Sequence, residues 1–227
     1  MKTFVILGAS RGIGVEVAIQ ASNAGHKVIA LARSKDKLDK LQLAFPSIQT
    51  AVIDLESKDV KNDIKAALTE VDKIDYLINN AGVLVNKPFK ELTREDFETS
   101  YQVNLIGIML ATQVVLEKME KGAHVVNISS MGGFQGTMKF PGLAAYSSSK
   151  AALASITELL AEEYKEEGIS FNCLALGAVQ TEMLEEAFPG YVAPLKPNEM
   201  AKYILDFTMN GAQFFNGKIL PVSSTTP

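Results

Sequence analysis

Short runs of β-branched and other apolar residues alternate along the chain with segments in which apolar residues recur at helical spacing. A short apolar run bounded by turn residues predicts a buried strand, whereas apolar residues three and four positions apart predict a helix that packs by one face. Seven runs fit the first description, and we predict strands over residues 3–7, 27–31, 50–53, 75–78, 123–128, 169–176 and 218–222.

The intervening segments carry the signals of helix starts. Residues 57–71 begin with a serine that can cap a helix, and one helical face collects Val60, Ile64, Leu68 and Val71. The sequence from Thr93 to Asp96 resembles a capping box. It predicts a long helix that begins there and runs to about Met119.

Strands that alternate with helices predict an α/β protein with a parallel sheet covered on both faces. We therefore expect a single-domain, doubly wound (Rossmann-type) parallel sheet of about seven strands, with helices on both faces, over residues 1–227. Right-handed crossovers place a ligand-binding crevice at the carboxyl ends of the strands. Residues 182–198 are expected to form a short substrate lid.

Composition excludes several classes of protein. The chain is 47% hydrophobic and 21% charged, which is typical of a globular protein and excludes a disordered one. A net charge of -4 disfavours nucleic acid and anionic membranes as partners. We see no signal peptide and no apolar run of membrane-spanning length, so a cytoplasmic protein is expected.

The residues that usually carry hydrolytic or metal chemistry are scarce. A single cysteine, Cys173, excludes an internal disulfide framework and a multi-cysteine zinc site, and its apolar neighbours predict a buried thiol. We predict no metal site. His26 and His124 stand in no recognisable arrangement with a serine or carboxylate, which disfavours a histidine-based hydrolase.

A glycine-rich turn follows the first predicted strand. Gly8, Gly12 and Gly14 stand at the spacing G-x-x-x-G-x-G, immediately before a segment with helical periodicity. Glycines at such a junction let backbone amides and the helix N-terminus approach a pyrophosphate. The same glycines could merely close a strand–helix junction, but their position favours phosphate binding.

A tyrosine and a lysine stand one helical turn apart, at Tyr146 and Lys150. A free phenol has a pKa of about 10, so a tyrosine that exchanges protons near neutrality needs a pKa lower by about 3. One ammonium about 4 Å away supplies about that much at an effective dielectric constant of about 20. We therefore expect Lys150 to lower the pKa of Tyr146.

Together these features resemble the short-chain dehydrogenase/reductase family over nearly the whole chain. The glycine turn resembles that family's cofactor motif, Asn79 to Gly82 its N-N-A-G, and Tyr146 with Lys150 its Y-x-x-x-K. The segments around Ser130 and from Phe140 to Lys150 are most similar to the carbonyl reductase/xylulose reductase branch.

The resemblance implies a catalytic role for four residues. Ser130 would orient a substrate carbonyl, Tyr146 would protonate it, Lys150 would tune the tyrosine and hold the nicotinamide ribose, and Asn104 would maintain a proton-relay water. The implied cofactor-binding residues are Gly8, Ser10, Arg11, Gly12, Ile13, Gly14, Arg33, Asp54, Leu55, Asn80, Ala81, Gly82, Tyr146, Lys150, Gly177, Val179 and Thr181.

The end of the second strand favours NADP(H) over NAD(H). Enzymes of this architecture that use NAD place an acid there, whereas this chain has Arg33 and no acid before Asp36. Arg33 can bind a phosphate in a bidentate manner, Arg11 can approach it from the glycine turn, and Lys35 and Lys37 add nearby charge.

We therefore expect NADPH-dependent reduction of a ketone or aldehyde. The alternatives are an NAD-dependent alcohol dehydrogenase that works oxidatively, and a nucleotide-sensing or scaffold protein of the same fold without turnover. The expected partner is a small-molecule carbonyl or alcohol.

The predicted long helix is apolar on two faces: Phe97, Tyr101, Leu105, Ile108, Thr112 and Leu116 form one, and Val103, Ile106, Leu110 and Val114 form the other. Such a helix indicates a homo-oligomer, a tetramer or a dimer.

Overall fold

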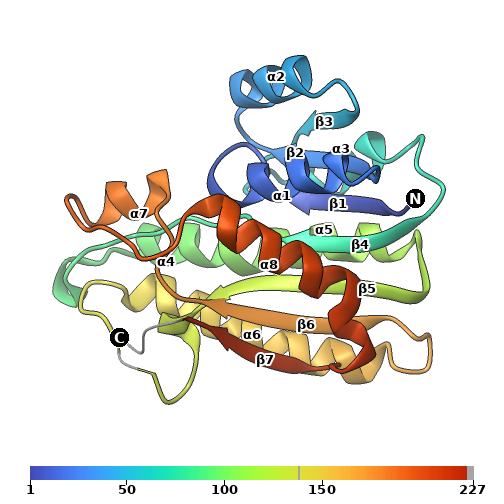
Figure 1. Ribbon diagram of the computed structural model, residues 1–227. Coiled ribbons are helices and arrows are strands. Elements are labelled where there is room, and N and C mark those ends of the chain that lie inside the picture. The colour runs from blue at the N-terminus through green and yellow to red at the C-terminus, as the bar shows by residue number, and fades with distance from the viewer. Residues whose placement is uncertain (138, 224–227) are drawn as a thin grey trace.

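The computed structural model describes residues 1–137 and 139–223. These residues form one seven-stranded parallel sheet in the order β3-β2-β1-β4-β5-β6-β7 (Figure 1). The strands are β1 (Thr3–Leu7), β2 (Lys27–Ala32), β3 (Ile48–Val52), β4 (Ile74–Asn79), β5 (Met119–Ser130), β6 (Ser170–Leu176) and β7 (Lys218–Val222). All seven predicted strands are present, and the doubly wound fold is confirmed.

Helices cover both faces of the sheet. The longer ones are α1 (Gly12–Asn23), α2 (Lys35–Ala44), α3 (Val60–Ala67), α4 (Arg94–Tyr101), α5 (Gly107–Leu116), α6 (Ala144–Glu163), α7 (Glu182–Ala187) and α8 (Pro197–Asn210). One core joins the sheet to α1, α2 and α8, and a second core on the opposite face joins it to α3, α5 and α6. Single-turn 3-10 helices lie at Phe89–Glu91, Met131–Gly133 and Gly211–Gln213.

The strand ends differ modestly from the predicted ones. The fifth strand begins at Met119 rather than at 123, because it continues through exposed residues that carry no apolar signal. Helix α3 is shorter than the predicted 57–71, and the Ser57 hydroxyl accepts a hydrogen bond from the Asp59 amide at 3.1 Å instead of capping the helix. The prediction that Ser57 caps this helix was therefore wrong.

The predicted long helix is interrupted. Its capping box is confirmed, since Thr93 and Asp96 exchange hydrogen bonds at 2.9 and 3.2 Å. However, Gln102–Ile106 form a π-helical turn between α4 and α5, and the helix ends at Leu116. A π turn holds one extra residue, so the face that points inward changes along the helix. The predicted division into two apolar faces was wrong at this turn, where polar Asn104 is fully buried.

This helical stretch also corrects one expectation about membranes. Residues Arg94–Leu116 are long and apolar enough, at a mean hydropathy of 1.2, to cross a membrane by length and composition alone. Among the described residues, no other helix meets that test. In the fold, however, α5 places Ile108, Ala111 and Val115 in the core against the sheet, so this is a core helix rather than a membrane span.

Large apolar side chains remain exposed on the α5–α6 side. Leu159 on α6 is 66% exposed and Ile106 is 45% exposed. If these side chains meet a second subunit, Leu159→Glu will convert the predicted oligomer to a monomer of 24.5 kDa in light scattering. Leu43→Glu, on α2 across the sheet, is the matched control because Leu43 is equally apolar and 85% exposed. A wild-type monomer at micromolar concentration would contradict the predicted assembly.

Candidate active site

A cavity of about 870 Å³ opens at the carboxyl ends of the strands, where the strand order reverses between β1 and β4. Helix α7 and the glycine turn lie at this edge of the sheet (Figure 1). Predicted site residues that line the cavity are Gly8, Ser10, Arg11, Gly12, Ile13, Arg33, Asp54, Leu55, Asn80, Ala81, Gly82, Ser130, Tyr146, Lys150, Gly177, Val179 and Thr181. Two others, Gly14 and Asn104, lie behind the lining rather than in it.

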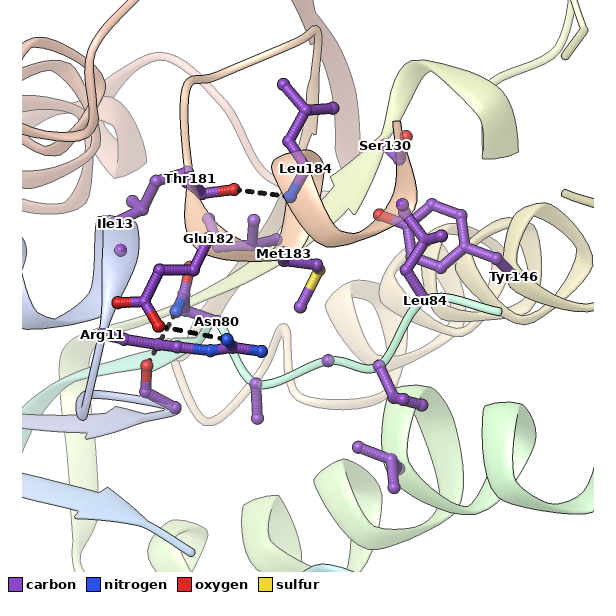
Figure 2. A pocket seen from close by; sticks show the side chains of 18 of the residues that line it. Arg11, Ile13, Asn80, Leu84, Ser130, Tyr146, Thr181, Glu182, Met183 and Leu184 are labelled. Atoms are coloured by element: carbon purple, nitrogen blue, oxygen red, sulfur yellow. Dashed lines mark hydrogen bonds and ion pairs between the residues drawn. The ribbon is translucent and has the colours of Figure 1, made fainter. Parts of the chain in front are cut away.

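The cavity has two chemically different ends. In Figure 2, Ser130 and Tyr146 lie at one end, and Arg11 and Glu182 lie at the other. Met183 and Leu184 from α7 lie between them. One continuous space thus joins a polar, charged region near the glycine turn to a hydroxyl-bearing region near α6.

The glycine turn packs tightly against the segment that follows β4. Gly8 has a φ of +80°, and a Cβ on it would lie 2.6 Å from the Ala81 nitrogen. The Asn80 side-chain amide donates a hydrogen bond to the Gly8 carbonyl oxygen at 3.0 Å. A Cβ on Gly14 would collide with the same oxygen, so Gly14 is required for packing although it does not line the cavity.

Helix α1 begins at the cavity without a capping side chain. Its N-cap residue, Arg11, makes no side-chain hydrogen bond to the first turn, and Gly12 and Ile13 line the space. The first amides of a helix need acceptors and carry a partial positive charge. This helix start therefore fits a phosphate group.

At the other end, β5 and α6 bring two hydroxyl groups together. The Ser130 hydroxyl lies close enough to the Tyr146 phenol to affect its pKa. Burial raises the pKa of Tyr146, and the neighbouring Ser130 hydroxyl partly opposes that rise. Ser129 has a different role, because its hydroxyl is buried and donates to the Lys150 carbonyl oxygen at 2.8 Å. Of the two neighbouring serines, Ser129 and Ser130, it is therefore Ser130 that lies beside the phenol.

Lys150 is almost fully buried, at 4% exposure, one turn after Tyr146. Its ammonium donates to the Ile128 carbonyl oxygen at 2.9 Å, and burial lowers its pKa to about 8. We expected this charge to bring the pKa of Tyr146 below its usual value. The pKa of Tyr146 is raised instead, because desolvation of the phenol outweighs the opposing effect of Ser130.

Asn104 binds the loop that follows β4. Its side-chain oxygen accepts from the Val83 amide at 2.8 Å, and its amide group donates to the Val83 carbonyl at 3.0 Å and the Ser149 hydroxyl at 2.9 Å. Both donors of the side chain are therefore used. The π-helical turn directs this amide inward, so Asn104 fixes the cavity wall at Val83 to α6 beside Tyr146.

Three cations at the charged end are paired with acids. Arg33 is 71% exposed and binds Glu56 at 3.2 Å. Arg11 and Lys37 both bind Glu182 on α7. Arg11 also binds Glu186 on the same helix. These acids were absent from the predicted site.

A partial signal for the acids exists in the sequence. The Thr181 hydroxyl caps α7 by accepting from the Leu184 amide at 3.2 Å, and Glu182 stands in that helix's first turn. Threonine followed by acids predicts such a helix start. The pattern does not show which cations lie opposite the acids.

The wall near Tyr146 is largely apolar. Four residues of the expected lid segment line the cavity there: Met183, Leu184, Phe188 and Tyr191. The described part of the opposite wall adds Val83, Leu84, Phe140 and Leu143. This end therefore favours a substrate with an apolar group beside its reacting centre.

His124 and Cys173 are core residues. His124 is fully buried between the Thr208 carbonyl and the Asn172 amide, each at 2.9 Å, and burial lowers its pKa to about 4. Burial raises the pKa of Cys173 to about 11. The expected buried thiol is confirmed, and His124 is likewise a buried side chain of the core.

Comparison with known proteins identifies the family. The short chain dehydrogenase family matches residues 2–191, and the chain belongs to that family of oxidoreductases. It is 34% identical over 182 residues to carbonyl reductase (NADPH) 2 of Sus scrofa, which covers 79% of this chain and 72% of the relative.

Solved structures show the same fold. A short chain dehydrogenase of Burkholderia cenocepacia in complex with NADP has a TM-score of 0.89 at 21% identity, over 99% of this chain and 97% of that one. A 3-ketoacyl-(acyl-carrier-protein) reductase of Brucella melitensis complexed with NADH has a TM-score of 0.85 at 25% identity, over 97% and 96%.

The burial of Lys150 predicts a pH dependence of stability. Its pKa is about 8 in the folded chain against 10.5 for the ordinary side chain, so the unfolded chain binds more protons between these values. The free energy of unfolding therefore rises with pH in that window. The free energy of unfolding of wild type, relative to that of Lys150→Met, should rise by about 2 kcal/mol between pH 7 and pH 10. Urea unfolding without cofactor would measure this rise. A difference that stays flat with pH would contradict the burial effect.

Proposed function

We propose that the protein reduces a ketone or aldehyde with NADPH. The observation that carries this proposal is the single cavity that joins the uncapped start of α1 and its neighbouring cations to the paired hydroxyls of Ser130 and Tyr146. NADPH, when bound, supplies the hydride for such a reduction.

The residues present fit a dinucleotide. Its pyrophosphate would lie at the first amides of α1, its adenosine between Arg33 and the Asp54–Leu55 segment, and its nicotinamide near Lys150 and Thr181. Strand β2 ends without an acid, and Arg33 follows it directly. That absence of a carboxylate and the basic residues beside it support the 2′-phosphate form of the cofactor.

Tyr146 is suited to donate the proton that reduction of a carbonyl requires. Because burial raises the pKa of its phenol, the side chain is protonated at neutral pH. Ser130 lies beside the phenol in the cavity wall, so a carbonyl oxygen that contacts both hydroxyls would be oriented for proton transfer. Lys150 and Asn104 would hold this corner of the cavity in place.

Two alternatives make different predictions. An NAD-dependent alcohol dehydrogenase would prefer NAD and an alcohol, and a nucleotide-sensing protein would bind NADPH without turnover. A panel of ketones and aldehydes followed by NADPH absorbance tests the proposed reduction, and a panel of alcohols followed by NAD reduction separates the two alternatives. The apolar wall at Met183 and Leu184 indicates that the panel should emphasise carbonyls with aromatic or aliphatic substituents.

Replacing Tyr146 by Phe removes the proposed acid and little else. Turnover should fall by about 100-fold or more, whereas NADPH binding should stay nearly unchanged, as steady-state kinetics and cofactor titration would show. Tyr203→Phe is the control, because Tyr203 lies on α8 and does not line the cavity. Activity of the Tyr146 variant within about threefold of wild type would exclude Tyr146 as the acid.

Cofactor choice gives a separate test at Arg33. We expect kcat/KM to be at least about tenfold higher with NADPH than with NADH, a difference of about 1.4 kcal/mol. Arg33→Asp should erase or invert this preference, with little loss of stability because the side chain is 71% exposed. Equal efficiency with both cofactors in the wild type would refute the proposed preference.

A further inference from the structure

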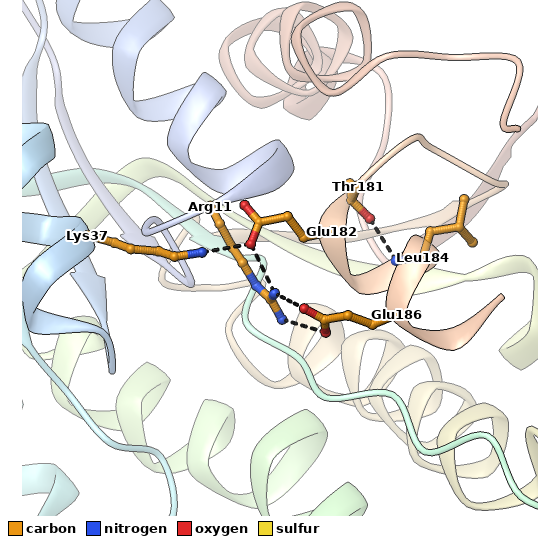
Figure 3. A network of polar contacts seen from close by, with 6 residues as sticks. All are labelled: Arg11, Lys37, Thr181, Glu182, Leu184 and Glu186. Carbon is orange, nitrogen blue, oxygen red and sulfur yellow. Dashed lines mark hydrogen bonds and ion pairs between the residues drawn. The ribbon is translucent and has the colours of Figure 1, made fainter. Parts of the chain in front are cut away.

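One carboxylate oxygen on α7 binds two cations from different elements. Oε2 of Glu182 accepts from the Lys37 ammonium at 2.7 Å and from the Arg11 guanidinium at 3.2 Å. Arg11 precedes α1, and Lys37 belongs to α2, so the carboxylate joins three parts of the chain (Figure 3). An anion held between a guanidinium and an ammonium is also the arrangement in which proteins bind phosphate.

A second lid acid strengthens the same contact. The Arg11 guanidinium donates to both carboxylate oxygens of Glu186, at 2.7 and 3.4 Å. Lys37, Glu182 and Glu186 all line the cavity beside Arg33, at the end where the proposed adenosine lies.

We propose that Glu182 and Glu186 tune cofactor specificity by competing with the 2′-phosphate of NADPH for Arg11 and Lys37. The proposal rests on the proposed function, because it assumes that a dinucleotide binds in this cavity. It assigns the phosphate to Arg11 and Lys37 in addition to Arg33. It also gives Glu182 and Glu186 a role in cofactor choice that does not depend on their contacting the cofactor.

The charges and exposures of Glu182 and Glu186 support their replacement by a phosphate at Arg11 and Lys37. Lys37 and Arg11 hold the pKa of Glu182 below its usual range, so the carboxylate is ionised at neutral pH and competes fully. The Glu182 and Glu186 side chains are 54% and 63% exposed, and such surface pairs are weak enough to break. A phosphate carries more negative charge than one carboxylate and offers more acceptors. NADH lacks this phosphate, so its binding would leave the pairs intact.

The test compares Glu182→Gln with Glu185→Gln. Glu185 is on the same helix, is exposed and does not line the cavity, so the control makes the same charge change away from the cations. Dissociation constants for NADPH and NADH are measured by nicotinamide fluorescence, which the tryptophan-free chain leaves unobscured. We expect Glu182→Gln to tighten NADPH by about threefold and to leave NADH within twofold. Glu185→Gln should leave the ratio of the two constants at its wild-type value.

Two further measurements separate the possible failures. Adenosine 2′,5′-bisphosphate and AMP differ by the same 2′-phosphate as NADPH and NADH, but they lack the nicotinamide. Their dissociation constants therefore test the competition independently of turnover. In a Lys37→Met background, the gain from Glu182→Gln should shrink because one of the contested cations is gone. A wild type that prefers NADPH, together with a Glu182→Gln variant of unchanged or weaker NADPH affinity, would overturn this inference alone. A wild type without any NADPH preference would overturn the proposed cofactor as well.

Discussion

The close approach of the turn after β1 to the segment after β4 shapes the whole site. Gly8 accepts a hydrogen bond from Asn80, and any side chain on Gly8 would collide with Ala81. Because the strand order reverses between these two strands, their carboxyl ends form the floor of the cavity. This contact holds the start of α1 at a fixed position relative to β4, and from that position the first amides of α1 line the cavity.

The two ends of the cavity differ in how far their charged and titratable side chains are exposed to solvent. At the hydroxyl end, burial moves the pKa values of Tyr146 and Lys150 in opposite directions, each toward its neutral form. The charged end is open to solvent, and its ion pairs on Arg11 and Lys37 are exchangeable. Helix α7 contributes to both, with apolar Met183 between the ends and Glu182 among the cations.

Periodicity and local motifs were sufficient to predict the strands, the glycine turn and the Tyr146–Lys150 pair, because each is a pattern of neighbouring residues. The π-helical turn at Asn104 could not be predicted in this way, since Gln102–Ile106 continue an ordinary helical pattern. The pairing of Arg11 with Glu182 joins residues 171 positions apart, and only the fold brings them together. The raised pKa of Tyr146 likewise depends on burial, which the spacing of two residues in a helix does not reveal.

The central claim is that one cavity brings a reduced nicotinamide and a carbonyl together beside Tyr146. Its most direct measurement uses NADPH carrying deuterium at both C4 positions of the nicotinamide, with the carbonyl panel, and mass spectrometry of the products. We expect an alcohol that carries one deuterium on the carbinol carbon for each NADPH consumed. Binding of NADPH without deuterium in any product, across a panel of apolar ketones and aldehydes, would contradict it.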